Sequence, residues 1–186
     1  MADKNKIASL DFTYFKWYNL RQYGTTFGRC RVEITIRRVR PDEMGLLCEL
    51  DVKIFGDEDA FNTPDLWEGL EAFFVVVNGL IVGSTALRHN TDVAESYEAD
   101  YAELHGSLYI VSTGIVPEWQ GQGIGSKVKE WQVDYAQAHR FARIVTNART
   151  SNTRSIKLNQ KLGFQIIQSI PGWYGDESTV VLERKL

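Results

Sequence analysis

The sequence has few of the residues that hold disulfide-rich or metal-dependent proteins together. Its 186 residues include only two cysteines, Cys30 and Cys48, and three histidines. Two cysteines are too few for a disulfide scaffold, and their spacing relative to the histidines matches no common zinc motif. We therefore expect reduced thiols, a cytoplasmic protein and no bound metal.

The sequence also lacks an excess of positive charge and a long apolar run. There are 21 Lys and Arg residues against 24 Asp and Glu residues, a formal net charge of -3, so no basic field would recruit nucleic acid. The first residues are polar and have no apolar core of signal-peptide length, and no later run has the roughly 20 apolar residues of a membrane helix. We expect a soluble protein with neither nucleic acid nor membrane as a partner.

What the sequence does contain is the pattern of one α/β domain with an extension. A hydrophobic content of 44% over this length suits a single compact core. Residues 1–30 carry seven aromatic side chains, too many for a solvated tail. We expect them to form an N-terminal extension that packs on the core or in a homodimer contact, and residues 31–186 to form the domain.

Apolar periodicity and turn residues predict the elements of this domain. Asn78-Gly79 predicts a type I′ hairpin turn. Strands are expected at residues 32–39, 73–77, 80–87, 108–116, 144–148, 164–170 and 178–183, and helices are expected to begin near Pro41, Ile124 and Asn152. The acidic stretch at residues 90–107 is expected to be a solvated loop or a short polar helix.

Two of these helices have a predicted apolar stripe. In the first helix the stripe consists of Leu46, Leu47 and Leu50. In the second helix apolar residues recur at helical spacing, and charged residues are expected on the solvent side. The apolar set is Ile124, Val128, Trp131, Tyr135 and Ala138, and the solvent-facing set is Lys127, Lys129, Glu130 and Asp134.

Three alternating glycines join the strand at residues 108–116 to the second helix. The spacing of Gly121, Gly123 and Gly125 fits neither the dinucleotide fingerprint nor the phosphate loop that ends in Gly-Lys-Ser/Thr. Successive backbone N–H groups at a helix start form an anion site, and glycine lets a phosphate approach them. A phosphate-bearing ligand is therefore favoured over a turn that is merely flexible.

Two segments resemble the signatures of the GNAT superfamily of N-acetyltransferases. Gln120-Gly-Gln-Gly-Ile-Gly125 resembles Gln/Arg-x-x-Gly-x-Gly/Ala, and the segment from Asn152 to Phe164 is similar to Asn-x-x-Ala-x-x-Leu-Tyr-x-Lys-x-Gly-Phe. The resemblance covers residues 32–186. It implies a mixed α/β sheet of the acyl-CoA acyltransferase type, with central strands at residues 108–116 and 144–148 that splay apart. It also implies acetyl-CoA as cosubstrate, and as acceptor a primary amine of a small molecule, a peptide or a protein.

The resemblance further implies which residues hold the coenzyme. Backbone groups of Ile115 and Val116 would bind the pantetheine arm, and polar side chains of the third helix, including Ser155, would line the arm. The full set of expected cofactor-binding residues is Ile115, Val116, Gln120, Gly121, Gln122, Gly123, Ile124, Gly125, Ser126, Asn152 and Asn159.

The catalytic residues are less well defined by the sequence. An attacking amine must lose a proton, the oxyanion needs N–H donors, which the resemblance places near Ile115, and the leaving thiolate takes up a proton. Many relatives have an acidic tyrosine where this chain has Asn159, and an asparagine cannot act as an acid. Candidates for the open roles are Tyr109 and Tyr174, and also Glu103 and His105. The absent tyrosine leaves open a second function, a coenzyme A binding or regulatory module with impaired catalysis.

One further segment bears on the acceptor. Residues 170–177, IPGWYGDE, are similar to the loop that grips the peptide in protein amino-terminal acetyltransferases. Trp173 takes the place of one of the two tyrosines in that loop. The same aromatic residues could instead form the wall of a small-amine pocket, or simply pack.

Overall fold

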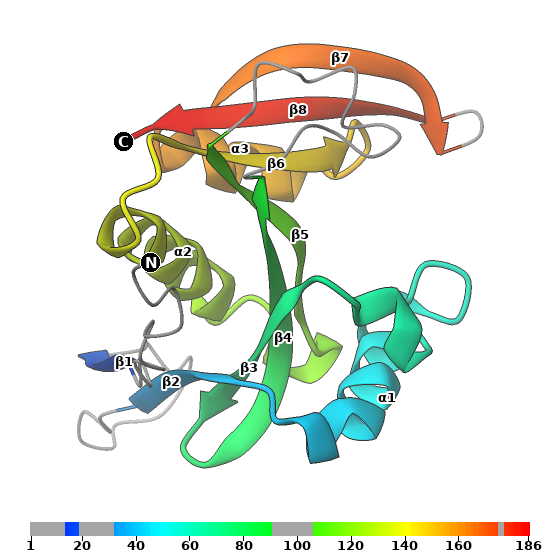
Figure 1. Ribbon diagram of the computed structural model, residues 1–186, viewed down its shortest axis with the longest axis vertical. Helices are drawn as coiled ribbons and strands as arrows, with labels where there is room; N and C mark the ends of the chain where they lie inside the picture. The colour runs from blue at the N-terminus through cyan, green and yellow to red at the C-terminus, as the bar shows by residue number, and fades with distance from the viewer. Residues whose placement is uncertain (1–13, 19–31, 91–105, 175–176) are drawn as a thin grey trace, which may run out of the picture.

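A computed structural model describes residues 14–18, 32–90, 106–174 and 177–186 (Figure 1). The helices are α1 (Met44–Phe55), α2 (Ile124–Ala138) and α3 (Thr153–Lys161), and short 3-10 turns lie at Pro41–Glu43, Pro64–Trp67 and Pro117–Trp119. The strands are β1 (Tyr14–Tyr18), β2 (Val32–Arg38), β3 (Glu71–Val77), β4 (Leu80–Asn90), β5 (Ser107–Ile115), β6 (Arg143–Arg149), β7 (Gln165–Tyr174) and β8 (Glu177–Lys185). Every element expected in the described ranges is present.

The strands form one mixed sheet, in the order β1-β2-β3-β4-β5-β6-β8-β7. All neighbouring pairs are antiparallel except β5 and β6, which are parallel. The two parallel strands pair only from Ser107–Arg143 to Ile110–Thr146, and beyond these residues they diverge (Figure 1). The expected splay of the two central strands is therefore confirmed.

A β-bulge lies where the splay begins. Leu87 of β4 pairs with Ile110, whereas the preceding residue, Ala86, pairs with Ser112. Val111 is thus the extra residue on β5, and an extra residue bends a strand and increases its twist. The bulge turns β5 at the level where β6 leaves it.

The expected hairpin is confirmed with its turn. Asn78 has a φ of 49° and Gly79 a φ of 82°, the left-handed conformations of a type I′ turn. The register on either side follows from this turn, with Val77 opposite Leu80.

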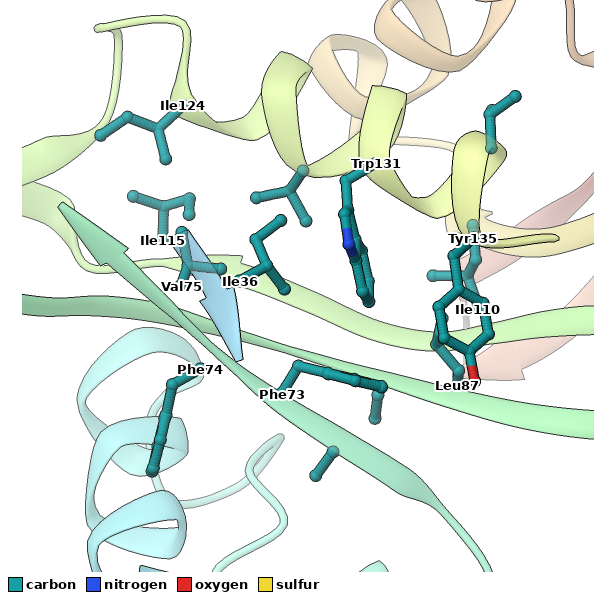
Figure 2. Close-up of a cluster of buried hydrophobic side chains, with 14 of the residues drawn as sticks. Ile36, Phe73, Phe74, Val75, Leu87, Ile110, Ile115, Ile124, Trp131 and Tyr135 are labelled. Carbon is teal, nitrogen blue, oxygen red and sulfur yellow. The ribbon is translucent and has the colours of Figure 1, made fainter. Parts of the chain in front are cut away.

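The core lies on both faces of the sheet. On the α2 face, the ring of Phe73 packs edge-on against Trp131, with 4.9 Å between centroids, and against Tyr135, at 5.8 Å (Figure 2). On the opposite face Phe74 points toward α1 (Figure 2), whose Leu47 is fully buried. The alternation of Phe73 and Phe74 is the period of a strand buried on both sides.

One residue of helix α1 that was predicted to be buried is exposed. Leu47 and Leu50 are buried, but Leu46 is 45% exposed. Successive residues on a helix point about 100° apart, and the face of α1 that meets the sheet is centred on Leu47, Leu50 and Asp51. Leu46 therefore falls outside that face.

The predicted exposure of two residues in helix α2 is also wrong. Lys129, expected on the solvent side, is only 6% exposed, and Ala138 is exposed while Ala136 is buried. Lys129 lies on the side of α2 that faces the opening between β5 and β6, and not on its solvent side.

The ends of the sheet also differ from expectation. Residues 171–174, expected in a loop, continue β7, with a break in register between Ile170 and Tyr174. Pro171 is accommodated because β7 is an edge strand. Within the N-terminal extension, β1 pairs with β2, whereas the sequence indicated no strand there. Of the loop expected at residues 90–107, Asn90 ends β4 and Ser107 begins β5, and residues 91–105 lie outside the described residues.

No helix in the described ranges is both long and apolar enough to cross a membrane. Cys48 is a buried free thiol, and Cys30 lies outside the described residues.

Candidate functional site

A cavity of about 800 Å³ occupies the opening between β5 and β6. Its walls are α1 with the segment that follows it, β5, the glycine loop, the start of α2, β6 and α3. Such a volume suits a cofactor-sized molecule. The topology creates the cavity, because two strands that stop pairing leave a gap that helices line but do not fill.

The glycine loop forms one end of the cavity. Gly121 and Gly123 have φ values of +78° and +84°, and Gly123 caps the N-terminus of α2 in the left-handed conformation. Apart from the chain neighbours and the nearby helix backbone, no atom of the described residues comes within 4 Å of a Cβ placed on Gly121 or Gly125. The loop therefore offers bare backbone to the cavity.

The start of α2 adds a positive field to this end. The first backbone N–H groups of a helix have no partner within the helix, and the helix dipole places partial positive charge there. The side chain of Gln120 fixes the approach to the helix, since its Nε2 donates to the Ile115 carbonyl at 2.8 Å. An anionic group would be held at this end by N–H donors and by the dipole.

Most of the expected cofactor-binding residues meet in the cavity wall. They are Ile115, Gln120, Gly121, Gly123, Ile124, Gly125, Ser126 and Asn152, joined by Ser155. Asn152 is also the N-cap of α3, accepting a hydrogen bond from the Ser155 N–H at 3.0 Å.

Three expected residues lie outside the cavity wall. The Val116 N–H donates to the Val82 carbonyl at 2.9 Å, and Gln122 Nε2 donates to the Glu118 carbonyl at 3.3 Å. Asn159 is fully buried, and its Nδ2 donates to the Ser155 carbonyl at 3.0 Å.

The two candidate tyrosines are placed differently. Tyr109 lines the cavity and packs with Val145 and Val181. The backbone of Tyr174 pairs with Glu177 where β7 meets β8, and its side chain is not among those described. Glu103 and His105 lie outside the described residues.

A carboxylate that the sequence reasoning missed lies in the wall formed by α1. Asp51 is 1% exposed and lines the cavity. Its Oδ2 accepts the Phe61 N–H at 2.8 Å, while its Oδ1 has no partner among the described residues. Burial raises the pKa of Asp51 to about 6, against the opposing effect of the Phe61 hydrogen bond. Its position four residues after Leu47, on the buried stripe, was the available signal.

Lys129 lines the same cavity, on the wall formed by α2. Burial lowers its pKa to about 7. No hydrogen bond or ion pair to it is found among the described residues. The sequence alone gives no signal for the burial of Lys129. The residue follows a buried valine, and at that position on the helix a side chain can be either buried or exposed.

A buried polar network holds α2 against the sheet beneath the cavity. Gln132 is fully buried, and its Nε2 donates to Thr85 Oγ1 and to Thr113 Oγ1, both at 2.8 Å. These bonds join α2 to β4 and β5 one turn beyond Lys129. They fix the helix face that carries Lys129.

The sequence profile of the Acetyltransferase (GNAT) family matches residues 41–164. The chain therefore belongs to this family, and the resemblance seen in the sequence is confirmed. A search of curated proteins gives no match.

Solved structures of acetyltransferases share the fold at low sequence identity. The ribosomal-protein-S18-alanine N-acetyltransferase of Escherichia coli is 16% identical with a TM-score of 0.65, over 82% of this chain and 93% of that one. Arabidopsis thaliana Naa50 in complex with the bisubstrate analogue CoA-Ac-MVNAL is 21% identical with a TM-score of 0.66, over 82% and 99%. Arabidopsis thaliana NAA60 in complex with a bisubstrate analogue is 15% identical with a TM-score of 0.67, over 82% and 97%.

The cavity has features that fit acetyl-CoA. The glycine loop is open where a Cβ would intrude, which suits a pyrophosphate. Asn147 of β6 lines the cavity, and its buried Oδ1 has no partner in the described part of the chain, so it can accept an N–H from an amide of the pantetheine arm. Within the described ranges, no group of three or more His, Cys, Asp or Glu residues could hold a metal ion.

Proposed function

We propose that the protein is an acetyl-CoA-dependent N-acetyltransferase that transfers the acetyl group to a primary amine by direct attack on the thioester. The observation that carries this proposal is the parting of β5 and β6 beyond Ile110 and Thr146, directly beside the glycine loop. The loop supplies a place for phosphates, and the gap supplies a place for an extended arm with an acyl group at its end.

The cavity wall suggests a role for each end of the site. The N–H groups of residues 121–126 hold the pyrophosphate, and Asn147 and Asn152 hold the amides of the arm. Acetyl-CoA supplies the activated acyl group. On the opposite side, the unpartnered Oδ1 of Asp51 attracts the acceptor ammonium and takes its proton. A pKa of about 6 leaves Asp51 mostly ionised at pH 7, as a general base requires.

The acceptor is a primary amine, either of a small molecule or at the amino terminus of a peptide. The aromatic rings of Phe55 and Phe61 line the cavity near Asp51 and suit an apolar first side chain. Two of the structural neighbours support the peptide alternative, since one is named for an alanine of a ribosomal protein and another is bound to CoA-Ac-MVNAL. Direct transfer means that no acyl-enzyme intermediate forms. The position of Cys48 supports it, because this thiol is buried and does not line the cavity.

Calorimetry with acetyl-CoA tests the cofactor site. Two variants at one position isolate the charge effect, since Asn and Asp both tolerate the left-handed conformation of Gly123 and differ by one negative charge. Gly123→Asn should weaken binding moderately, and Gly123→Asp should abolish it, because a carboxylate would face the phosphates. Absence of heat with the native protein, or equal affinities for the two variants, would contradict the proposal.

A second candidate is a coenzyme A binding module with impaired catalysis. Asn159 favours it, because this residue stands where relatives have an acidic tyrosine and its side chain bonds back to its own helix. Both candidates predict acetyl-CoA binding, so turnover distinguishes them. Release of the coenzyme A thiol with any member of a panel of polyamines and peptides with free amino termini supports the enzyme. No thiol release with any amine, while acetyl-CoA still binds, supports the binding module.

We also propose that the chain forms a homodimer through the aromatic extension at residues 1–30. Sedimentation equilibrium of the full chain and of a chain beginning at residue 31 tests this, and a monomer in both cases contradicts it. The cytoplasmic location expected from the composition stays a prediction, which cell fractionation would check.

A further inference from the structure

We propose that Lys129 donates the proton that the coenzyme A thiolate takes up as it leaves. This inference rests on the proposed acetyl transfer and names the acid for that reaction. The juxtaposition that carries it is a lysine in the cavity wall that is only 6% exposed and has no partner among the described residues, in a chain whose Asn159 cannot supply a proton.

The position of Lys129 is fixed from both sides. It lies four residues after Gly125, hence about 6 Å farther along the helix axis, and three residues before Gln132, which is bonded to Thr85 and Thr113. Lys129 therefore lines the cavity on the part of α2 that follows the glycine loop. A structural role for the charge would call for a partner, and none is found among the described residues.

The charged groups around the cavity leave Lys129 free to change its protonation. On its own helix, Lys127 and Glu130 pair with each other at 2.8 Å. Across the cavity, Arg149 of β6 is paired with Asp59, and the remaining charged wall residues are Arg154 of α3 and Asp51 of α1. Burial is the only cause that lowers the pKa of Lys129, so no fixed carboxylate holds its proton.

The acidity of the two groups favours transfer. A thiol has a pKa of about 8.5, whereas that of Lys129 is about 7. A proton shared between them prefers the sulfur by about 30-fold, the ratio that corresponds to a difference of about 1.5 units. An ordinary lysine, with a pKa of about 10.4, would hold its proton instead.

The reaction balances with the two buried groups. The neutral amine forms the C–N bond, the C–S bond breaks, and its electron pair goes to sulfur. Lys129 gives a proton to the thiolate. Asp51, having first passed to solvent the proton that it took from the acceptor ammonium, takes the surplus proton from the new amide nitrogen. Lys129 ends neutral and Asp51 ends protonated, so one proton passed from Asp51 to Lys129 through solvent restores both.

Nuclear magnetic resonance of protein labelled at the lysine side chains tests the free protein. One lysine should titrate near pH 7, and that signal should be missing from Lys129→Met but present in Lys127→Met, the matched control on the same turn. Titration of Lys129 at the ordinary lysine value would overturn the proposal.

Single-turnover acetyl transfer separates proton donation from a mere positive charge. Lys129→Met should slow the chemical step about 100-fold, the low end for general acid catalysis, and should remove the fall in rate above pH 7. Lys129→Arg should be equally slow, because guanidinium does not release its proton. Lys127→Met should match the native protein, and calorimetry should give all variants the native affinity for acetyl-CoA.

Other results would overturn this role while leaving the proposed acetyltransferase intact. They are full activity of Lys129→Met, rescue by Lys129→Arg, or weakened acetyl-CoA binding as the only defect. An acetyl group found on Lys129 by mass spectrometry would also exclude it, because an acetylated lysine has no acidic proton. Failure of the native protein to bind acetyl-CoA would instead refute the proposed function.

Discussion

Thr146 and Ile110 form the last contact between the two central strands. They are the final pair of the β5–β6 ladder, and Thr146 Oγ1 also donates to the Ile110 carbonyl at 3.2 Å. Both residues are buried and both line the cavity. This side-chain bond lies at the apex of the splay, where the sheet stops and the cavity begins.

Removing that bond should loosen the apex. Thr146→Val keeps the shape of the side chain and leaves the Ile110 carbonyl one donor short, which should cost about 1 kcal/mol of unfolding free energy. Urea denaturation measures the loss, and acetyl-CoA affinity should fall with it. Thr146→Ser retains the hydroxyl and should lose less. Equal stability of Thr146→Val and the native protein would show that the bond contributes nothing.

Gly114 sets how closely α1 approaches β5. A Cβ at this position would overlap Ile54 Cγ2 and lie 2.7 Å from the Phe55 ring. Gly114→Ala should therefore push α1 outward and cost about 1–3 kcal/mol, as other overpacking changes do. The control is Gly45→Ala within α1, where a Cβ meets none of the described residues within 4 Å beyond its own helix and stability should stay level or rise slightly. Thermal unfolding of the two variants makes the comparison.

The parts of this fold that could be predicted from sequence are those with local causes. Asn78-Gly79 fixes a hairpin because its backbone angles are intrinsic to the two residues, and Asn152 caps α3 through a side chain three residues from its partner. The glycine loop was identified for the same reason, since positive φ values need glycine. The edge position of β7, which allows the strand to continue through Pro171, has no such local signal in the sequence.

The residues that sequence reasoning misplaced depend on the gap in the sheet. Asp51 lies on the buried face of α1, and its spacing from Leu47 was a signal that could have been used. Lys129 lies at the margin of the predicted apolar stripe of α2, and burial at such a margin depends on what lies opposite. Where β5 and β6 part, the helices border a cavity rather than solvent. Charged side chains at that margin are then enclosed without being packed, and no pattern within a single helix carries this information.

Glu71 should make folding stability depend on acid. The imidazole of His89, whose Nε2 lies 3.4 Å from Glu71 Oε2, contributes most to lowering the pKa of Glu71. The hydrogen bond donated by Tyr135 and the charge of Arg38 add to this, and the pKa falls to about 2 against the effect of burial. The unfolded chain has the ordinary value near 4.5, so the stabilisation is complete above pH 4.5 and is lost as the pH falls toward 2.

The matched variant for this cluster is Glu71→Gln. It should unfold more easily than the native protein at pH 6, and the difference should narrow between pH 4.5 and pH 2. Chemical denaturation across this range measures it. If the difference in unfolding free energy between the two proteins stays constant with pH, the Glu71 side chain acts by packing alone and not through its charge.

Asp51 should show opposite effects on activity and on stability. Burial raises its pKa to about 6 from an ordinary 3.8, so the folded protein binds this proton more tightly than the unfolded chain. Stability from this group is therefore complete below pH 3.8 and is lost as the pH rises through 6.

Asp51→Asn retains an oxygen to accept the Phe61 N–H and carries no charge, so it should gain stability relative to the native protein between pH 4 and pH 7. As the proposed base, the same residue should be needed for turnover, and Asp51→Asn should lower kcat by about 100-fold or more. Denaturation curves and amine acetylation measured on one preparation test both effects, and a variant that is less stable above pH 6 or fully active would refute the assignment.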